Sequence, residues 1–454
     1  MSKPINTSCS DHDVNPLDKQ QVDAEILKLA LPSLATLLAE PLLVAADSTM
    51  VGRLSTTPLA GLSLSSTILT TLVGLCIFLA YASTAATARL VGAGKPKQGL
   101  RQGIDSLWLA AGLGIILGAI LFFGSPVILE FFHPSKEVLA QAIFYTKFSC
   151  FGLPGMLLVL AATGTLRGFA DAKTPLYAST AGALLNIPLN YILIYVLHMG
   201  VGGAGLGTAI AQTLMAIYLM SAIRRRAHHL QVSAKPTGVG VLRSLREAIP
   251  LIVRTLSLRG AILLQIAAAT SLGTVALAAN QIVMTVWNFA AYGLDSLATA
   301  AQILVGQNLG SQDKHRVHHV LHRCLSWGAR VGFGLGIILG ALSFFIPRIM
   351  TTDPSVQHLA TQTMWVTSVS MPIAAIAYML DGVLIGAGDT RKLARYMVAA
   401  LIVFAPVPLI ILLCGSSWGM PGMLLLWGGY ALLFMVARGI TMFFRVRGNS
   451  WMGF

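Results

Sequence analysis

The chain has 454 residues, of which 55% are hydrophobic and 11% are charged, and its formal net charge is +14. Soluble domains carry about 25% charged residues, so most of this chain cannot face water and a soluble globular protein is excluded. Its five cysteines lie far apart and form no Cys-x-x-Cys pair, which argues against a metal site or a disulfide framework. The polar N-terminus has no basic leader, and we interpret it as a cytoplasmic tail and not as a signal peptide.

Twelve apolar stretches follow one another along the chain, each long enough to cross the ~30 Å hydrocarbon core of a bilayer as a helix. We expect these helices at 25–51, 57–88, 104–125, 138–165, 175–198, 203–223, 247–270, 274–303, 323–347, 357–385, 393–414 and 419–443. The predicted fold class is therefore an all-α polytopic membrane protein with twelve transmembrane helices.

The basic residues lie on one side of these predicted helices. Twenty-two Lys and Arg fall in the segments on the side of the termini, against Arg53, Lys136 and Arg348 on the other side. The positive-inside rule then places both termini on the cytoplasmic side of the membrane, which we expect to be the cell inner membrane. Because topology accounts for the positive charge, we do not expect nucleic acid as a partner.

The two halves of the sequence resemble each other. GLGIILGA at 112–119 recurs at 334–341, and LRGFADAKT at 166–174 matches LIGAGDTRK at 384–392, with offsets near 218 residues. Six helices per half is an even number, so a pseudo-two-fold axis along the membrane normal should relate two six-helix lobes, with the working site between them. We predict a cytoplasmic tail at 1–24, lobes at 25–223 and 247–443, a cytoplasmic linker at 224–246 and a second tail at 444–454.

Ionisable side chains are rare within the predicted helices. Each costs roughly 2.5–3.5 kcal/mol at the centre of a membrane on insertion scales, and each marks a functional site by default. The first helix carries two acids, Glu40 and Asp47, and the others are Arg254, Arg259, Asp295 and Asp381. We expect all of them except Asp47 to form a charge network between the lobes or to line the substrate cavity. Simple ion pairing between helices is the alternative for these residues.

Asp47 differs because no basic residue except Arg53 is predicted at its depth, and Arg53 should extend to the surface. Burial disfavours the charged form of a carboxylate, so Asp47 is expected to gain and lose a proton, or else to bind Na⁺. Asn186 and Asn190 share one face of the fifth helix, and Thr208 lies in the glycine-rich start of the sixth. These three are further candidates for a functional site, unless they serve only in packing between helices.

The chain resembles the multidrug and toxic compound extrusion (MATE) family over nearly its whole length, and within it the DNA-damage-inducible (DinF-like) subfamily. The resemblance rests on AEPLLVAADSTMVGRL ahead of PLAGL, LRGFADAKTP, NIPLNYILIY followed by GVGGAGLGTAIAQ, LAANQI, and LDGVLIGAGDT. It implies a secondary antiporter that exports organic, often cationic and amphipathic compounds by alternating access, against an inward flow of H⁺ or Na⁺.

The resemblance also implies residue roles. Asp47 matches the acid that carries the coupling ion, and Asn186, Asn190 and Thr208 match the polar residues that support it. Family members often have an acid where this chain has Asn190. Arginines occupy the seventh helix, where other branches hold second-lobe acids. Both departures favour H⁺ over Na⁺ as the coupling ion.

Two other functions compete with this one. A flippase for a lipid-linked precursor shares the duplicated plan, but it needs a cation-rich cavity, for which Arg254 and Arg259 are the only candidates. A membrane-embedded enzyme needs a nucleophile or acid–base groups that lie together at the same depth in the membrane. We identify no catalytic residues of that kind. We expect a monomer in the bilayer with a small organic substrate, no metal site and no cofactor beyond the coupling ion.

Overall fold

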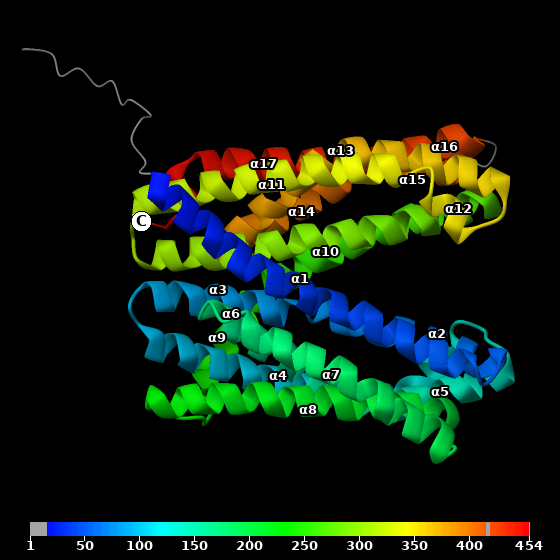
Figure 1. Ribbon diagram of the computed structural model, residues 1–454, viewed down its shortest axis with the longest axis horizontal. Coiled ribbons are helices and arrows are strands. Elements are labelled where there is room, and N and C mark those ends of the chain that lie inside the picture. Colours follow the sequence, from blue (N-terminus) through cyan, green and yellow to red (C-terminus); the bar gives the residue numbers. More distant parts are fainter. Residues whose placement is uncertain (1–15, 415–417, 454) are drawn as a thin grey trace, which may run out of the picture.

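The computed structural model describes residues 16–414 and 418–453, and nearly all of them are helical (Figure 1). The first half comprises α1 (Pro16–Gly52), α2 (Thr56–Leu75), α3 (Phe78–Gly92), α4 (Pro96–Glu130), α5 (Lys136–Cys150), α6 (Leu153–Gly168), α7 (Lys173–Tyr191), the π-helical η1 (Ile192–Val196) and α8 (Gly200–His229). The second half comprises α9 (Gly238–Ser271), α10 (Thr274–Gly310), α11 (Lys314–Leu342), α12 (Ile346–Met350), α13 (Pro354–Ala387), α14 (Thr390–Phe404), α15 (Pro406–Cys414), α16 (Gly419–Trp427), the π-helical η2 (Gly428–Phe434), α17 (Met435–Arg447) and the 3₁₀ turn η3 (Asn449–Trp451).

Within the described residues, eleven helical stretches are long and apolar enough to cross a membrane, and α5 with α6 completes a twelfth span. These two helices meet at an angle of 50°. Helix α6 begins at Leu153, and Pro154 follows in its first turn, where proline supplies no backbone N–H to continue the preceding helix. The predicted all-helical membrane fold is confirmed.

The helices extend beyond their predicted bounds. Helix α1 begins at Pro16 instead of near residue 25, and α8 and α9 leave only residues 230–237 of the predicted linker 224–246 without helix. The predicted bounds were set by the apolar residues alone. A helix can continue for further turns of polar residues after it leaves the hydrocarbon region of the membrane.

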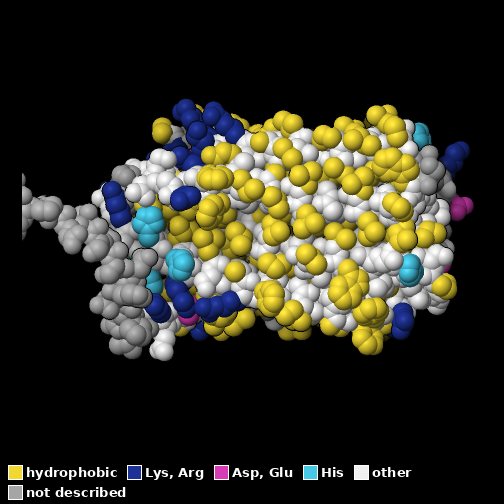
Figure 2. Space-filling view, turned by 90° about the horizontal axis from the view of Figure 1, so that it is seen from above, with side chains coloured by type: hydrophobic (Ala, Val, Ile, Leu, Met, Phe, Trp, Pro, Cys, Tyr) yellow, Lys and Arg dark blue, Asp and Glu magenta, His cyan; other side chains and the backbone are white. Residues whose placement is uncertain are grey.

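Charged and apolar side chains separate along the long axis of the molecule. Lys and Arg gather at the end that carries the C-terminus, here called the basic end, and the opposite end is called the far end (Figures 1 and 2). Between them Figure 2 shows a broad hydrophobic belt. Large apolar side chains that are exposed include Ile115, Phe123, Phe333 and Ile337. An apolar belt of this kind is suited to contact with lipid.

Two crossing helices connect the lobes. Helix α1 starts beside α11, where Arg323 (3.0 Å) and Trp327 (2.8 Å) donate to the Asp23 carboxylate, and it runs obliquely to the first lobe (Figure 1). Helix α9 starts on α4 of the first lobe, where Gln102 donates to Glu247 over 3.2 Å. Each half thus begins with a helix that is anchored to the opposite lobe.

The lobes share a hydrophobic core at the basic end. One cluster of buried side chains combines Phe78 and Leu166 of the first lobe with Leu304 and Leu380 of the second. The other two clusters lie within a single lobe each. The conformation described here is therefore closed at the basic end.

Glycines bring the backbones of α3 and α10 together at this closure. A Cβ atom at Gly92 would lie 1.8 Å from the carbonyl oxygen of Gln307, and one at Gly310 would lie 2.0 Å from the carbonyl oxygen of Arg89. Backbone atoms cannot move aside as a flexible side chain can. A methyl group at either position therefore requires the two lobes to separate.

We expect Gly92→Ala to shift the protein away from this closed conformation, because the added methyl group collides with the Gln307 backbone. Spin labels at Gln98 and Ser311, measured by double electron–electron resonance, should report a longer distance between the lobes. Gly112→Ala is the matched control, since a Cβ there meets nothing within 4 Å. An unchanged distance distribution in Gly92→Ala would show that the glycine contact does not hold the lobes together.

Candidate functional site

Asp47 forms a buried hydrogen-bonded site in the first lobe. Its carboxylate is 5% exposed. Asn190 of α7 donates to one oxygen over 2.5 Å, and Thr208 of α8 donates to the other over 2.9 Å. Both partners are neutral, and none of the described residues forms an ion pair with the carboxylate, which is therefore held by hydrogen bonds.

Asn186 completes this polar cluster. It donates to the Thr208 hydroxyl over 3.2 Å, and its own oxygen accepts from Asn190 over 3.1 Å. The structure thus brings Asp47, Asn186, Asn190 and Thr208 together, as the family resemblance implied. The Asn190 oxygen is buried and has no hydrogen-bond partner among the described residues.

The sequence around the site explains how the helices come so close. A Cβ at Gly207 would lie 2.0 Å from the Asn190 oxygen, so a larger residue there would displace the Asn190 amide from its place between Asp47 and Asn186. Pro188 removes one backbone donor within α7, and the helix continues as the π-helical η1. Tyr195 of η1 then donates to the Met50 carbonyl over 2.6 Å and ties this segment to α1.

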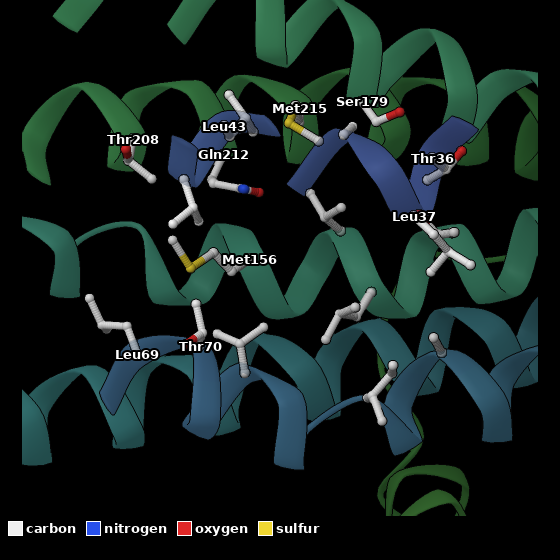
Figure 3. A pocket seen from close by; sticks show the side chains of 18 of the residues that line it. Thr36, Leu37, Leu43, Leu69, Thr70, Met156, Ser179, Thr208, Gln212 and Met215 are labelled. Carbon is white, nitrogen blue, oxygen red and sulfur yellow. The ribbon is translucent and has the colours of Figure 1, made fainter. Parts of the chain in front are cut away.

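A cavity extends from Asp47 through the first lobe. Figure 3 shows Leu43 of α1, Met156 of α6, and Gln212 and Met215 of α8 directed into a common space. Its wall is mainly apolar, with several hydroxyl side chains. Flexible methionine side chains suit a surface that must adapt to different organic molecules.

A second polar group lies at the junction of the cavity and the lobe interface. The Tyr81 hydroxyl of α3 donates to both oxygens of Asp295 on α10, over 3.1 Å each, and both residues line the cavity. Gln302 of α10 also donates to the Tyr81 carbonyl over 2.8 Å. Asp295 therefore ties the second lobe to the first beside the cavity.

Asp381 forms a buried ion cluster with two arginines. Arg254 donates through two nitrogens to the two oxygens of Asp381, and Arg438 lies 3.7 Å from one of them. The Arg254 guanidinium also lies 5.3 Å from the centre of the Tyr81 ring. This cluster is next to the Tyr81–Asp295 contact, but neither arginine lines the cavity.

Arg259 and Glu40 complete the predicted set. Arg259 is exposed on α9, and its guanidinium lies against Gly74 of α2. The structure therefore does not place Arg259 in the cavity. Glu40 belongs to α1, but its side chain lies outside the described residues, so the predicted pairing of Glu40 with Arg254 or Arg259 stays a prediction.

Sequence reasoning missed Arg438, Tyr81 and Arg167. Arg438 is 1% exposed within α17. It lies inside the predicted helix 419–443, so it could have been identified as Arg254 was, by being a charged residue within a predicted transmembrane helix. Arg167 falls between the predicted helices 138–165 and 175–198, whereas in the structure it is 6% exposed and lines the cavity. Tyr81 gave no signal, because tyrosine is ordinary in an apolar helix.

The described part of the second lobe has other residues at the equivalent positions. With the offset of 218 residues, Gln265 corresponds to Asp47 and Phe404 to Asn186. Phe404, Trp427, Tyr430 and Phe434 pack there, and the Tyr430 and Phe434 rings stack with their centres 5.7 Å apart. Aromatic side chains thus fill the region that forms a cavity in the first lobe.

Comparisons with known proteins agree with this architecture. The profile of the family described as MatE matches residues 32–192 and again 250–410. The chain is 29% identical to Protein DETOXIFICATION 44, chloroplastic, of Arabidopsis thaliana, over 97% of this chain and 86% of that protein. It is 28% identical to DNA damage-inducible protein F of Escherichia coli (strain K12), over 84% of each chain.

Solved structures show the same fold. A crystal structure of MATE in the bent conformation aligns with a TM-score of 0.87 at 18% identity, over 96% of this chain and 97% of that chain. An outward-facing multidrug resistance MATE family transporter aligns with a TM-score of 0.84 at 19% identity, over 97% and 99%. The chain therefore belongs to the MATE family and is a multi-pass membrane transporter of the multidrug and toxin efflux type, not an enzyme.

Proposed function

We propose that this transporter is an H⁺-coupled antiporter that exports organic, often cationic compounds by alternating access. The observation that carries the proposal is Asp47, a buried carboxylate in the cavity wall whose partners Asn190 and Thr208 are neutral. Asp47 is the residue that would carry the proton. Asp47 and Asp295 would also attract a cationic substrate into the apolar cavity.

The hydrogen bonds at Asp47 suit a group that changes protonation state. Donation from Asn190 and Thr208 stabilises the carboxylate, while burial stabilises the neutral acid. A protonated Asp47 would need an acceptor for its new O–H group. The Asn190 oxygen, which has no partner among the described residues, can serve after rotation of its amide.

The geometry also favours H⁺ over Na⁺. A Na⁺ site needs several oxygen ligands, but Asn190 and Thr208 direct donors toward Asp47. One carboxylate would supply the negative charge of such a site. Protonation neutralises this charge, and the only change the cluster then needs is the rotation of the Asn190 amide.

The closure at the basic end supports alternating access. The lobes share a core there, with glycine contacts between α3 and α10, and helices α1 and α9 cross between the lobes. Opening this end while the lobes close at the far end would carry the cavity from one side of the membrane to the other.

Flux through proteoliposomes tests the proposal. Purified protein is reconstituted, and a panel of cationic dyes is followed under an imposed pH gradient or an imposed Na⁺ gradient. We expect the pH gradient to drive dye movement and the Na⁺ gradient alone to have no effect. Transport that depends on Na⁺ and ignores the pH gradient would refute H⁺ coupling.

The orientation is a separate prediction. We propose that the basic end, with both termini, lies in the cytoplasm of a cell inner membrane. Ser233 is exposed in the link between α8 and α9 at this end, so Ser233→Cys should resist an impermeant thiol reagent in intact cells and react after lysis. A cysteine at exposed Lys136, the first residue of α5 at the far end, is the control that should react from outside. Rapid labelling of Ser233→Cys in intact cells would show that the orientation is opposite to the one proposed.

The flippase alternative gains no support from the cavity. Arg254 is paired with Asp381, Arg259 is exposed elsewhere, and neither lines the cavity. A lipid-linked pyrophosphate would require several cations around its headgroup.

A further inference from the structure

Two hydrogen bonds cross between the lobes at the closed basic end. Arg89 of α3 donates to the Gly386 carbonyl of α13 over 3.5 Å, and Gln307 of α10 donates to the Gly168 carbonyl of α6 over 3.1 Å. Arg89 and Gln307 are separated by the repeat offset of 218 residues, and so are Gly168 and Gly386. The two hydrogen bonds are therefore the same contact, repeated about the pseudo-two-fold axis.

Both acceptors lie at the C-terminal ends of helices. Gly168 is the last residue of α6, and Gly386 is the last but one of α13. The final carbonyl groups of a helix have no backbone donor within it, and the helix dipole makes this end partly negative. A donor from the opposite lobe thus satisfies a group that the helix itself cannot satisfy, and the positive charge of Arg89 suits the end of α13.

The residue in the turn after each helix matches the donor that reaches that turn. Gly388 and Ala170 are equivalent positions, and both have a positive φ, of 78° and 59°. A Cβ at Gly388 would lie 1.8 Å from the Arg89 Nη1, so a methyl group there would displace the guanidinium from the turn. At the equivalent turn the donor is the shorter Gln307, and the residue is alanine. Arginine thus occurs with glycine, and glutamine with alanine.

Arg89 forms no ion pair with an acid among the residues that the structure describes. Glu247 of the crossing helix α9 lines the same small cavity as Arg89. The Glu247 carboxylate accepts from Gln102 over 3.2 Å and from Arg243 over 3.1 Å. The hydrogen bond that Arg89 makes across the lobes therefore goes to a backbone carbonyl and not to a carboxylate.

The two hydrogen bonds lie where the lobes approach each other most closely. Ala88, next to Arg89, is fully buried, and a Cβ at Gly306, next to Gln307, would lie 3.1 Å from the Ala88 Cβ. Ala88 and Gly306 are again equivalent positions. Opening the basic end separates α3 from α10 at this point, so it must break both hydrogen bonds.

We propose that Arg89 and Gln307 form a symmetric latch that holds the basic end closed, and that both hydrogen bonds are released in every transport cycle. Each lobe supplies one donor and one acceptor, so neither lobe can move away at this end while the latch is formed. Neither residue lines the first-lobe cavity. They are positioning residues for the conformational change, and the latch does not depend on the proposed H⁺ coupling.

Thiol labelling at the interface measures the opening. Ala88→Cys is the reporter, because a fully buried thiol reacts with N-ethylmaleimide only when the lobes separate. All variants carry this reporter, the protein is held in nanodiscs, and peptide mass spectrometry gives the labelling rate at each cysteine. We expect Gln307→Leu and Arg89→Leu each to raise the reporter rate about threefold or more, because each removes one hydrogen bond of the latch.

The glycine in the turn provides a sharper test. Gly388→Ala should also raise the reporter rate, since the methyl group displaces the Arg89 guanidinium. Adding Arg89→Gln should return the rate toward that of the reporter alone, because the pair then reproduces the glutamine and alanine of the first-lobe turn. Gly94→Ala is the matched control and should leave the rate unchanged. Gly94 also has a positive φ, of 69°, but a Cβ there meets nothing within 4 Å.

Native Cys150 reports any general loss of packing in the same samples, because it is buried in a cluster within the first lobe. A faster reporter with an unchanged rate at Cys150 supports the latch. Unchanged reporter rates in both leucine variants would overturn it, and so would an equal acceleration at Cys150.

The Gly388→Ala pair decides the matter if a leucine variant does not fold. A double variant with Arg89→Gln that labels more slowly than Gly388→Ala alone supports the latch, and one that labels as fast or faster overturns it. These rates are measured without substrate or gradient. Failure of the H⁺-coupling proposal would therefore leave the latch standing, and a failed latch would leave H⁺ coupling untouched.

Discussion

Asp47→Asn is expected to abolish transport driven by a pH gradient while leaving the folded yield near that of the wild type. Asparagine keeps the size of the side chain and can still accept a hydrogen bond from Thr208, but it cannot carry a proton. Proteoliposome flux under an imposed pH gradient measures the first effect, and size-exclusion chromatography of the purified protein measures the second.

A second Asp→Asn variant serves as the control. Asp353 caps the start of α13 at the surface, where its carboxylate accepts from Ser355 over 2.8 Å, and asparagine caps a helix about as well. Asp353→Asn should therefore transport like the wild type. If Asp47→Asn pumps at the wild-type rate, Asp47 does not carry the coupling proton.

Asp381→Asn should cause the largest loss of stability among single substitutions of these acids. Asp381 is 3% exposed and is the carboxylate that compensates Arg254 and Arg438. Neutralising it strands buried positive charge, and breaking a buried ion pair in this way costs about 3–5 kcal/mol. The melting temperature of the protein in detergent should fall strongly, and adding Arg438→Gln should recover part of the loss.

Asp389→Asn is the matched control, because Asp389 pairs with Arg445 over 2.6 Å near the surface, with both side chains partly exposed. Exposed pairs contribute about 0–1 kcal/mol, so this variant should melt close to the wild type. Equal melting temperatures for Asp381→Asn and the wild type would show that the cluster does not stabilise the fold.

The polar site was largely predictable from the sequence. Asn186 and Asn190 are one helical turn apart, and the glycine-rich stretch around Thr208 predicts close packing of the next helix. These local patterns mark the three residues as candidates, the family resemblance placed them around Asp47, and the structure shows the hydrogen bonds that join them. The twelve helices were predictable for a similar reason, since the membrane thickness sets the length of each apolar stretch.

The charge clusters were less predictable, because apolar patterns do not tell which helices become neighbours. Arg254 pairs with Asp381, 127 positions away, and Asp295 binds Tyr81, 214 positions away. The crossing of α1 and α9 between the lobes brings distant segments together in a way that helix periodicity does not encode. Comparison of the two repeats would have distinguished Arg167 from Ile385 and directed attention to the cavity.

Proton release on substrate binding tests the role of Asp47 most directly. Purified protein in a weakly buffered detergent solution with a pH indicator is mixed with a cationic substrate. Substrate and proton compete at one site in the proposed exchange, so the wild type should release up to one proton per bound substrate, whereas Asp47→Asn should bind substrate without proton release. Equal proton release by Asp47→Asn and the wild type would contradict the assignment of the coupling proton to Asp47.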